Sequence, residues 1–212
     1  MRFVLVHGGF HGAWCWERII PEIEALGHTT IAIDLPGHGD RVHDEVTLAT
    51  RRQALVDVIE PGDVLVGHSG GGYDITLAAD AVPDRVGHLI YLATGLPIEG
   101  RPLIEASGGR PADDVGDDGR TQLMTDDTGM MDFITVDGQG NMVCSDFART
   151  WAFFYHDCDE DTARQAFEQL TPAPVGFIQE PFHVPRFWQA DLPRSYIRCL
   201  QDRSAPKWLS DH

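Results

Sequence analysis

Short apolar runs alternate with longer amphipathic stretches through the first half of the chain. Four of these runs are short enough to be strands, at residues 3–6, 30–33, 64–66 and 88–92. Between them, apolar residues recur at helical spacing at residues 16–26, 48–59 and 73–81. Strands that alternate with amphipathic helices are typical of a parallel sheet covered by helices on both faces. The pattern therefore predicts a doubly wound, mostly parallel α/β fold.

The simplest strand order for such a sheet is 2-1-3-4-5, which makes the first and third strands neighbours at the topological switch point. The loop after the first strand, residues 7–10, then lies beside the turn after the third strand. Ligands of open α/β sheets bind in this crevice, at the carboxyl ends of the strands. We therefore expect the functional site there.

The alternation stops in the middle of the chain. An Asp- and Gly-rich stretch at residues 113–127 is followed by an aromatic one at residues 151–155. We predict one domain, in which residues 1–94 and 194–212 form the α/β core and residues 95–193 form an inserted helical lid.

A helix start is predicted inside the lid. Asp157 and Glu160 have the spacing of a capping box, in which Asp157 is the N-cap and Glu160 reaches back to it. A metal site formed by His156, Cys158 and these acids is the alternative, but the cap explains the carboxylates without a metal. We expect no metal and no cofactor.

A catalytic motif lies at the end of the third predicted strand. Residues 67–71, Gly-His-Ser-Gly-Gly, have the G-x-S-x-G spacing of a nucleophile elbow. A serine in a tight strand-to-helix turn needs neighbours without a Cβ atom, which Gly67 and Gly71 supply. The alternative is a glycine-rich turn with an incidental serine. A strand before the motif and a helix after it favour Ser69 as a nucleophile.

Acyl transfer by a serine also needs oxyanion donors, a base and an acid that orients the base. The backbone N–H groups of Gly70, directly after the serine, and of Gly9, in the loop after the first strand, are the expected donors. The acid should follow a strand end beyond the serine. Asp202 satisfies this requirement, because the sheet is expected to resume with a fifth strand at residues 195–200. The alternative is an aspartate that caps a turn or helix.

The histidines do not supply an evident base. Four that precede the predicted acid lie in loops, where a histidine more often orders the backbone than transfers protons: His7, His11, His38 and His68. Only His212 follows Asp202, and a helix that starts near Pro206 would carry it away from the site.

The charge balance limits the class of partner. Acidic residues outnumber basic ones 33 to 16, which gives a formal net charge of -17. Such a surface repels nucleic acid and anionic membranes, although solubility alone also explains it. No apolar run approaches the ~20 residues that span a bilayer. The expected partner is a small molecule, and the sequence leaves a homodimer open.

The cysteines indicate a reducing compartment. Cys15, Cys144, Cys158 and Cys199 form no C-x-x-C pair and no short-spaced zinc pattern. The chain opens directly into a strand, without a charged-then-apolar leader. We therefore expect reduced thiols in a cytoplasmic protein.

Several segments resemble the compact α/β-hydrolases of the methyl-ester esterase and hydroxynitrile lyase group. They are residues 3–14, 26–29, 32–35, 67–71 and 196–202. The resemblance runs from residue 3 to about residue 209 and is weakest in the lid. It implies an α/β-hydrolase fold. It also implies that Ser69 is the nucleophile, Asp202 the triad acid, and Gly9 and Gly70 the oxyanion hole.

Two positions separate the esterases from the lyases. The lyases have a threonine directly after the first histidine of the loop, where this chain has Gly8, and a glutamate before the serine, where it has His68. Both differences favour a carboxylic-ester hydrolase. The remaining alternatives are a hydroxynitrile lyase and a noncatalytic ligand-binding protein on the same scaffold.

The resemblance also implies that the catalytic histidine follows a further strand beyond residue 212. We therefore expect the native polypeptide to continue with a strand, a loop bearing that histidine and a closing helix. The substrate pocket is expected to involve Phe10, His11, Trp151 and Phe154, which suits a small or medium, largely apolar ester. Ordinary lid packing is the alternative role for these aromatic residues.

Overall fold

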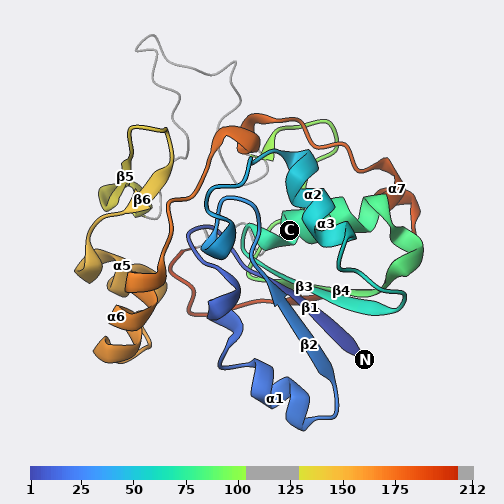
Figure 1. Cartoon of the computed structure of the whole chain (residues 1–212), viewed down its shortest axis with the longest axis horizontal. Coiled ribbons are helices and arrows are strands. Elements are labelled where there is room, and N and C mark those ends of the chain that lie inside the picture. The colour runs from blue at the N-terminus through green and yellow to red at the C-terminus, as the bar shows by residue number, and fades with distance from the viewer. Residues whose placement is uncertain (104–128, 205–212) are drawn as a thin grey trace.

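A five-stranded parallel sheet forms the centre of the structure (Figure 1), a computed structural model that describes residues 1–103 and 129–204. Its strand order is β2-β1-β3-β4-β7. The strands are β1 (Arg2–Val6), β2 (Thr29–Ile33), β3 (Asp63–His68), β4 (Val86–Leu92) and β7 (Arg194–Ile197). All four pairings are parallel, which confirms the predicted fold class and the order 2-1-3-4-5.

Alternate residues of the central strands pack against opposite layers. Val4 and Val6 face a core that includes Leu55, Ile75 and Phe187. These three residues belong to α2 (Leu48–Val56), α3 (Gly71–Ala81) and α7 (Pro185–Gln189). The other face, with Leu5 and Val66, packs on η1 (Ala13–Trp16) and α1 (Ile20–Ala25). The sheet is therefore covered on both sides.

The helix predicted at residues 16–26 is in fact two elements. The short 3-10 helix η1 ends at Trp16, and α1 begins at Ile20 with Pro21 in its first turn. Proline has no amide hydrogen, and its ring would clash with the carbonyl of Glu17 in a continuous helix. Pro21 is tolerated at a helix start, so the second element begins there.

The lid gathers on one side of the sheet (Figure 1). It contains an antiparallel hairpin and two longer helices: β5 (Ile134–Val136), β6 (Met142–Cys144), α5 (Phe147–Phe154) and α6 (Glu160–Gln169). Two 3-10 helices flank them, η5 (Met130–Asp132) and η6 (Gly176–Gln179). The lid has its own apolar cluster, in which Phe133 and Phe153 pack with ring centroids 5.2 Å apart.

The end of the predicted insertion packs on the α/β core. Phe182, Val184 and Phe187 are buried in the same cluster as Val4 and Leu65. Polar contacts agree, because the N–H groups of Arg186 and Phe187 both donate to Asp80 of α3, at 2.7 and 3.0 Å. The predicted lid thus contains a distal part and a segment that covers α3.

The predicted helix cap is wrong by two residues. The N-cap of α6 is Asp159, whose carboxylate accepts from the N–H of Thr162 at 2.8 Å, and not Asp157. The N–H of Cys158 bonds to the carbonyl of Tyr155, so a turn occupies the position where the predicted helix would start. Among the residues that the structure covers, no cluster of three or more potential metal ligands occurs. The helix predicted from Pro206 lies outside the described residues.

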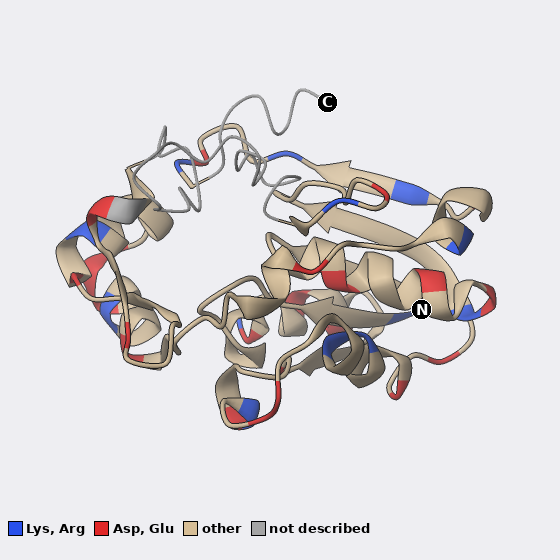
Figure 2. Cartoon of the chain, turned by 90° about the horizontal axis from the view of Figure 1, so that it is seen from above, with Lys and Arg blue, Asp and Glu red and all other residues tan. Residues whose placement is uncertain are grey.

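The surface features agree with the composition. All four cysteines are free thiols. Acidic and basic residues are interspersed along the described parts of the chain (Figure 2). Within residues 1–103 and 129–204, no helix is long and apolar enough to cross a membrane.

A buried ion pair joins α2 to α3. Arg51 donates from Nε and Nη2 to the two carboxylate oxygens of Asp74, at 2.8 and 2.7 Å, and both side chains are at most 4% exposed. The guanidinium also lies over the ring of Phe177 at 4.5 Å and contacts the carbonyl of Pro36 at 3.5 Å. Arg51 therefore connects four elements: α2, α3, η6 and the loop after β2.

We expect Arg51→Met to lower the free energy of unfolding by about 3–5 kcal/mol, because it leaves the buried carboxylate of Asp74 without its partner. The double substitution Arg51→Met with Asp74→Leu should recover at least half of this loss, because it removes the orphaned charge. Urea denaturation of the three proteins measures both effects. A double variant no more stable than Arg51→Met would contradict this account.

Candidate active site

The predicted nucleophile lies in a strained turn between β3 and α3. Ser69 has a φ of 51°, in the left-handed region that non-glycine residues rarely adopt. Its N–H donates to the carbonyl of Leu92 at 3.0 Å, and its carbonyl accepts from the hydroxyl of Thr94. The residue is exposed. The sheet and Thr94 therefore hold the backbone while the side chain remains accessible.

Close backbone contacts require the glycines around this turn. A Cβ on Gly67 would lie 2.5 Å from the carbonyl oxygen of Gly71. One on Gly71 would lie 2.6 Å from the carbonyl oxygens of Val6 and His7, at the end of β1. Real Cβ atoms do not approach other atoms this closely, so the turn packs against β1 only because these side chains are absent. This is the geometry expected of a nucleophile elbow.

The loop after β1 lies directly against the elbow. A Cβ on Gly8 would be 2.8 Å from the Cβ of Ser69, and one on Gly70 would be 3.7 Å from the backbone nitrogen of Gly9. Gly70 is also the N-cap of α3, where free N–H groups and the helix dipole favour negative charge. The structure thus brings Gly9, Gly70 and Ser69 together in an arrangement that could bind an oxyanion.

Asp202 lies in the loop after β7 at the same edge of the sheet. Its Oδ1 accepts from the N–H and the hydroxyl of Ser204, both at 2.7 Å, so it does cap a turn. Burial lowers the pKa of His68 in the elbow to about 4, and the charge of Asp202 opposes that lowering. The capping role expected as an alternative is present, and it is compatible with a second role near Ser69.

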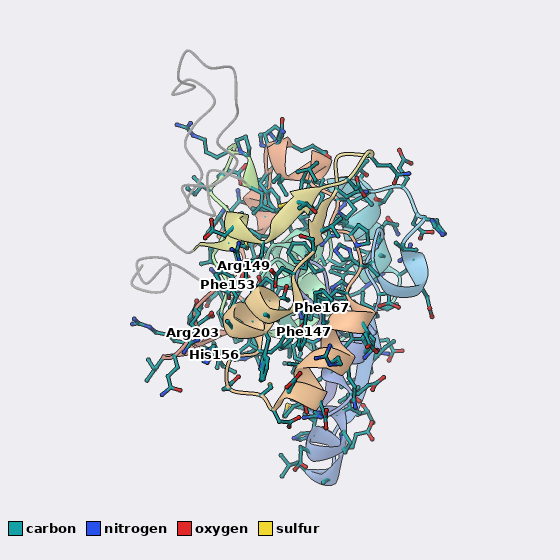
Figure 3. The ribbon with its side chains drawn as sticks, turned by 90° about the vertical axis from the view of Figure 1, so that its left-hand side faces the viewer. Phe147, Arg149, Phe153, His156, Phe167 and Arg203 are labelled. Atoms are coloured by element: carbon teal, nitrogen blue, oxygen red, sulfur yellow. The ribbon has the colours of Figure 1, made fainter. Side chains whose placement is uncertain are left out.

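The lid contacts the loop that carries Asp202. His156 donates from Nε2 to the carbonyl of Gln201 at 3.1 Å, and Arg203 donates to the carbonyl of Ala152 at 3.0 Å. Figure 3 shows His156 and Arg203 close together beside α5. The residues on both sides of Asp202 are therefore attached to the end of α5.

Comparison with known proteins identifies the family. Residues 3–212 match the family model described as "Alpha/beta hydrolase family". The chain belongs to the alpha/beta hydrolase family. The match confirms the resemblance predicted from the motifs and accounts for an elbow at the carboxyl end of β3.

Three relatives illustrate the similarity of this alpha/beta hydrolase to known proteins. Norfluorocurarine synthase 1 of Strychnos is 38% identical over 233 residues, covering 100% of the chain and 83% of that protein. Esterase PIR7B of Oryza sativa subsp. japonica is 38% identical over 111 residues, 48% of this chain but only 41% of the esterase, so the match spans less than half of that relative. An extracellular alpha/beta-hydrolase from a Paenibacillus species has a TM-score of 0.77 and 24% identity, covering 98% of this chain and 81% of that one, which supports the fold.

His7 and His11 hold backbone groups near the end of β1. His7 accepts at Nε2 from the N–H of Leu35 at 3.1 Å, so its Nδ1–H donates to the carbonyl of Gly8 at 2.7 Å. His11 contacts the carbonyl of Gly9 through Nδ1 at 2.8 Å. Burial lowers the pKa of both rings, that of His7 well below its usual value. Both are therefore neutral near pH 7.

His38 and His68 are neutral for the same reason. Burial, followed by the charge of Arg51, lowers the pKa of His38 to about 4. Burial also lowers the pKa of His68 to about 4. No hydrogen bond joins the hydroxyl of Ser69 to a histidine within the described parts of the chain, so these parts contain no assembled serine–histidine pair.

The four predicted pocket residues do not all meet. The ring centroid of Phe154 lies 6.0 Å from that of Phe10 and 6.1 Å from that of His11. Trp151 instead stacks on Phe147 with a centroid distance of 5.8 Å. Phe147 lies against Phe167 of α6, and Figure 3 labels both residues. Three of the four therefore gather beside the loop after β1, whereas Trp151 stacks within α5 and donates from Nε1 to the carbonyl of Cys158 at 3.1 Å.

Two neighbours of the site were missed from the sequence. Thr94 holds the elbow carbonyl, and a Cβ on Gly72 would collide with its side chain. Tyr155 bonds to His11 across 144 residues of sequence. The strand end before Thr94 was a usable signal, whereas nothing in the sequence pairs Tyr155 with His11.

A hollow on the lid was also not predicted. It has a volume of about 270 Å³. Its lining residues come from η5, α5 and their neighbours: Gly129, Asp132, Phe133, Arg149, Ala152 and Phe153. Figure 3 shows Arg149 and Phe153 on this part of the lid. None of the lining residues belongs to the elbow or to the loop after β1.

We expect His38 to make stability fall as the pH decreases from about 6.5 to about 4. Over this range the unfolded ring binds a proton that the buried ring, with its lowered pKa, does not, so acid favours unfolding. His38→Asn keeps a donor for the carbonyl of Pro36 but cannot titrate. It should reduce the slope of the unfolding free energy against pH by up to about 1.4 kcal/mol per pH unit.

Urea denaturation at four pH values across this interval measures the slope. His43→Asn, which replaces an exposed histidine, is the matched control and should retain the slope of the wild type. An equal slope in the wild type and His38→Asn would refute the assignment.

Proposed function

We propose that this protein is a carboxylic-ester hydrolase that forms an acyl-enzyme on Ser69. The observation that carries the proposal is the exposed serine with a φ of 51°, beside the backbone nitrogens of Gly9 and Gly70. Strain of this kind persists where the surroundings impose it, and it is common at catalytic sites. The similarity to Esterase PIR7B supports the same reaction class.

In the proposed reaction, the Ser69 hydroxyl oxygen attacks the ester carbonyl and its proton passes to a histidine base. The N–H groups of Gly9 and Gly70 donate to the oxyanion of the tetrahedral intermediate. The intermediate collapses, and the alcohol leaves with the proton from the histidine. Water then attacks the acyl-enzyme by the same route and releases the acid. Asp202 orients the histidine, which we assign to a position beyond residue 212.

The proposed substrate is a small or medium, largely apolar ester. Phe10 and Phe154 supply apolar surface beside the loop after β1, and all the neighbouring histidines are neutral. An apolar environment excludes water and strengthens the hydrogen bonds to the oxyanion. No metal or cofactor enters this mechanism.

We expect Ser69→Ala to reduce the hydrolysis of p-nitrophenyl butyrate by roughly 10⁴-fold or more, because it removes the nucleophile. Release of p-nitrophenol measures the rate. Ser195→Ala, which alters an exposed serine of β7, is the control and should change the rate by less than about twofold. Hydrolysis that survives Ser69→Ala would contradict the mechanism.

Two further measurements test the alternative functions. Binding of the ester without turnover by the full-length protein would indicate a noncatalytic binding protein. Release of cyanide from mandelonitrile above background would indicate a hydroxynitrile lyase. We expect neither, because Gly8 and His68 differ from the lyase pattern.

We expect Asp202→Asn to lower kcat by roughly 10⁴-fold, since an amide cannot stabilise the imidazolium or fix its tautomer. The amide oxygen can still accept from Ser204, so the turn and the thermal midpoint should be retained. Steady-state kinetics and a thermal melt separate the two roles. Loss of stability with little loss of kcat would restrict Asp202 to capping. Asp157→Asn, an exposed aspartate of the lid, is the control.

A further inference from the structure

A chain of two hydrogen bonds connects the lid to the loop after β1. The hydroxyl of Tyr155, at the end of α5, lies 2.6 Å from Nε2 of His11. Nδ1 of His11 lies 2.8 Å from the carbonyl oxygen of Gly9. The two rings are in edge contact, with centroids 5.9 Å apart. His11 is only 8% exposed, so water does not compete effectively for these bonds.

The direction of both bonds is fixed by their chemistry. A carbonyl oxygen can only accept, so the hydrogen of the neutral His11 ring is on Nδ1 and points to Gly9. Nε2 is then an acceptor, and the hydroxyl of Tyr155 must donate to it. Burial lowers the pKa of His11 and raises that of Tyr155, so both groups are neutral near pH 7. The carbonyl of Gly9 thus fixes the tautomer, and Tyr155 holds the His11 ring in place through its other nitrogen.

Gly9 depends on such bonds because packing does not fix it. A Cβ on Gly9 would have no atom within 4 Å, and the residue is exposed. Glycine has the widest choice of backbone angles, so its two flanking peptides could rotate. His7 holds the Gly8 carbonyl, whose planar peptide carries the Gly9 N–H on the opposite side, and His11 holds the Gly9 carbonyl.

Phe10 adds a further attachment to the lid. It has a φ of 67°, its carbonyl accepts from the N–H of Thr171 at 2.9 Å, and its ring is buried in the lid cluster with Phe133 and Phe153. The loop that carries Gly9 is therefore held by the lid as well as by β1.

We propose that His11 and Tyr155 form a positioning pair through which the lid sets the orientation of the Gly9 oxyanion donor. The inference rests on the proposed function, because the oxyanion role of Gly9 belongs to it. Neither side chain needs to touch the reacting atoms. The pair acts on the transition state, where the oxyanion forms, and not on ground-state binding of the ester.

Two substitutions of His11 divide the pair. Asn places an amide N–H where Nδ1 lies and keeps the bond to Gly9, whereas Gln reaches the position of Nε2 and keeps the contact with Tyr155. We expect His11→Gln to lower kcat for p-nitrophenyl butyrate by roughly 10- to 100-fold with KM nearly unchanged, a loss smaller than deletion of a donor. His11→Asn should recover most of this loss. Tyr155→Phe should lower kcat several-fold.

Arg18→Met is the matched control. It removes another hydrogen bond between lid and core, from Arg18 to the hydroxyl of Thr162, without contact to the loop after β1. It should leave kcat unchanged. Equal losses of kcat in His11→Asn and His11→Gln would overturn the inference, as would an equal loss in Arg18→Met.

Nitrogen NMR tests the positioning without reference to catalysis. Side-chain ¹H–¹⁵N spectra of the full-length wild type should show His11 with its hydrogen on Nδ1. Tyr155→Phe should shift the Nε2 signal, because it removes the hydrogen bond to that nitrogen. The amide signal of Gly9 should shift in Tyr155→Phe and His11→Gln but not in Arg18→Met. An unmoved Gly9 signal in both variants would overturn the inference. A wild type without hydrolysis dependent on Ser69 would instead refute the proposed function, and the NMR result would still decide the positioning.

Discussion

The close approach of the β3–α3 turn to the end of β1 is the constraint on which the site depends. The carbonyl oxygens of Val6 and His7 occupy the space that a side chain at Gly71 would need. This contact leaves the backbone of Ser69 in the left-handed region, at a cost on the order of 1–3 kcal/mol. The parallel pairing of β1 with β3 and of β3 with β4 offsets that cost, because the sheet holds the strand end of the turn from both sides.

The sheet could be predicted from the sequence because each strand is recognisable from its own residues. Each strand is a short apolar run, and the strand order follows from the rules for doubly wound sheets. Two helix boundaries were predicted wrongly, because neighbouring residues offered alternative helix starts. Pro21 divides a helix that apolar spacing alone would continue, and Asp159 takes the cap that Asp157 could also have formed. Pro21 and Asp159 are both visible in the sequence, but only the backbone geometry shows that the helices begin near these residues and not at the predicted ones.

The part of the candidate site that lies at strand ends could be predicted from the sequence. Ser69, Gly9 and Gly70 each follow a strand that the sequence identifies, so the fold brings them together. Tyr155 could not be found this way, because its partner His11 is 144 residues distant and the contact depends on how the lid packs. Trp151 was assigned to the pocket from composition, whereas Phe147 on the same helix offers it a nearer aromatic neighbour.

The lid does more than cover the sheet, because it is attached to the loop after β1 and to the loop after β7. Both loops lie at the same edge of the sheet as the elbow. The lid holds Phe10 and His11 on one side and the residues flanking Asp202 on the other. The proposed nucleophile, Ser69, is held by β3, β4 and Thr94, all parts of the α/β core. The lid therefore contributes, together with β1 and β7, to the distances from Ser69 to its proposed oxyanion donor and acid. A shift of the lid would change the geometry of the transition state even if the elbow did not move, which gives α5 and α6 a direct influence on rate.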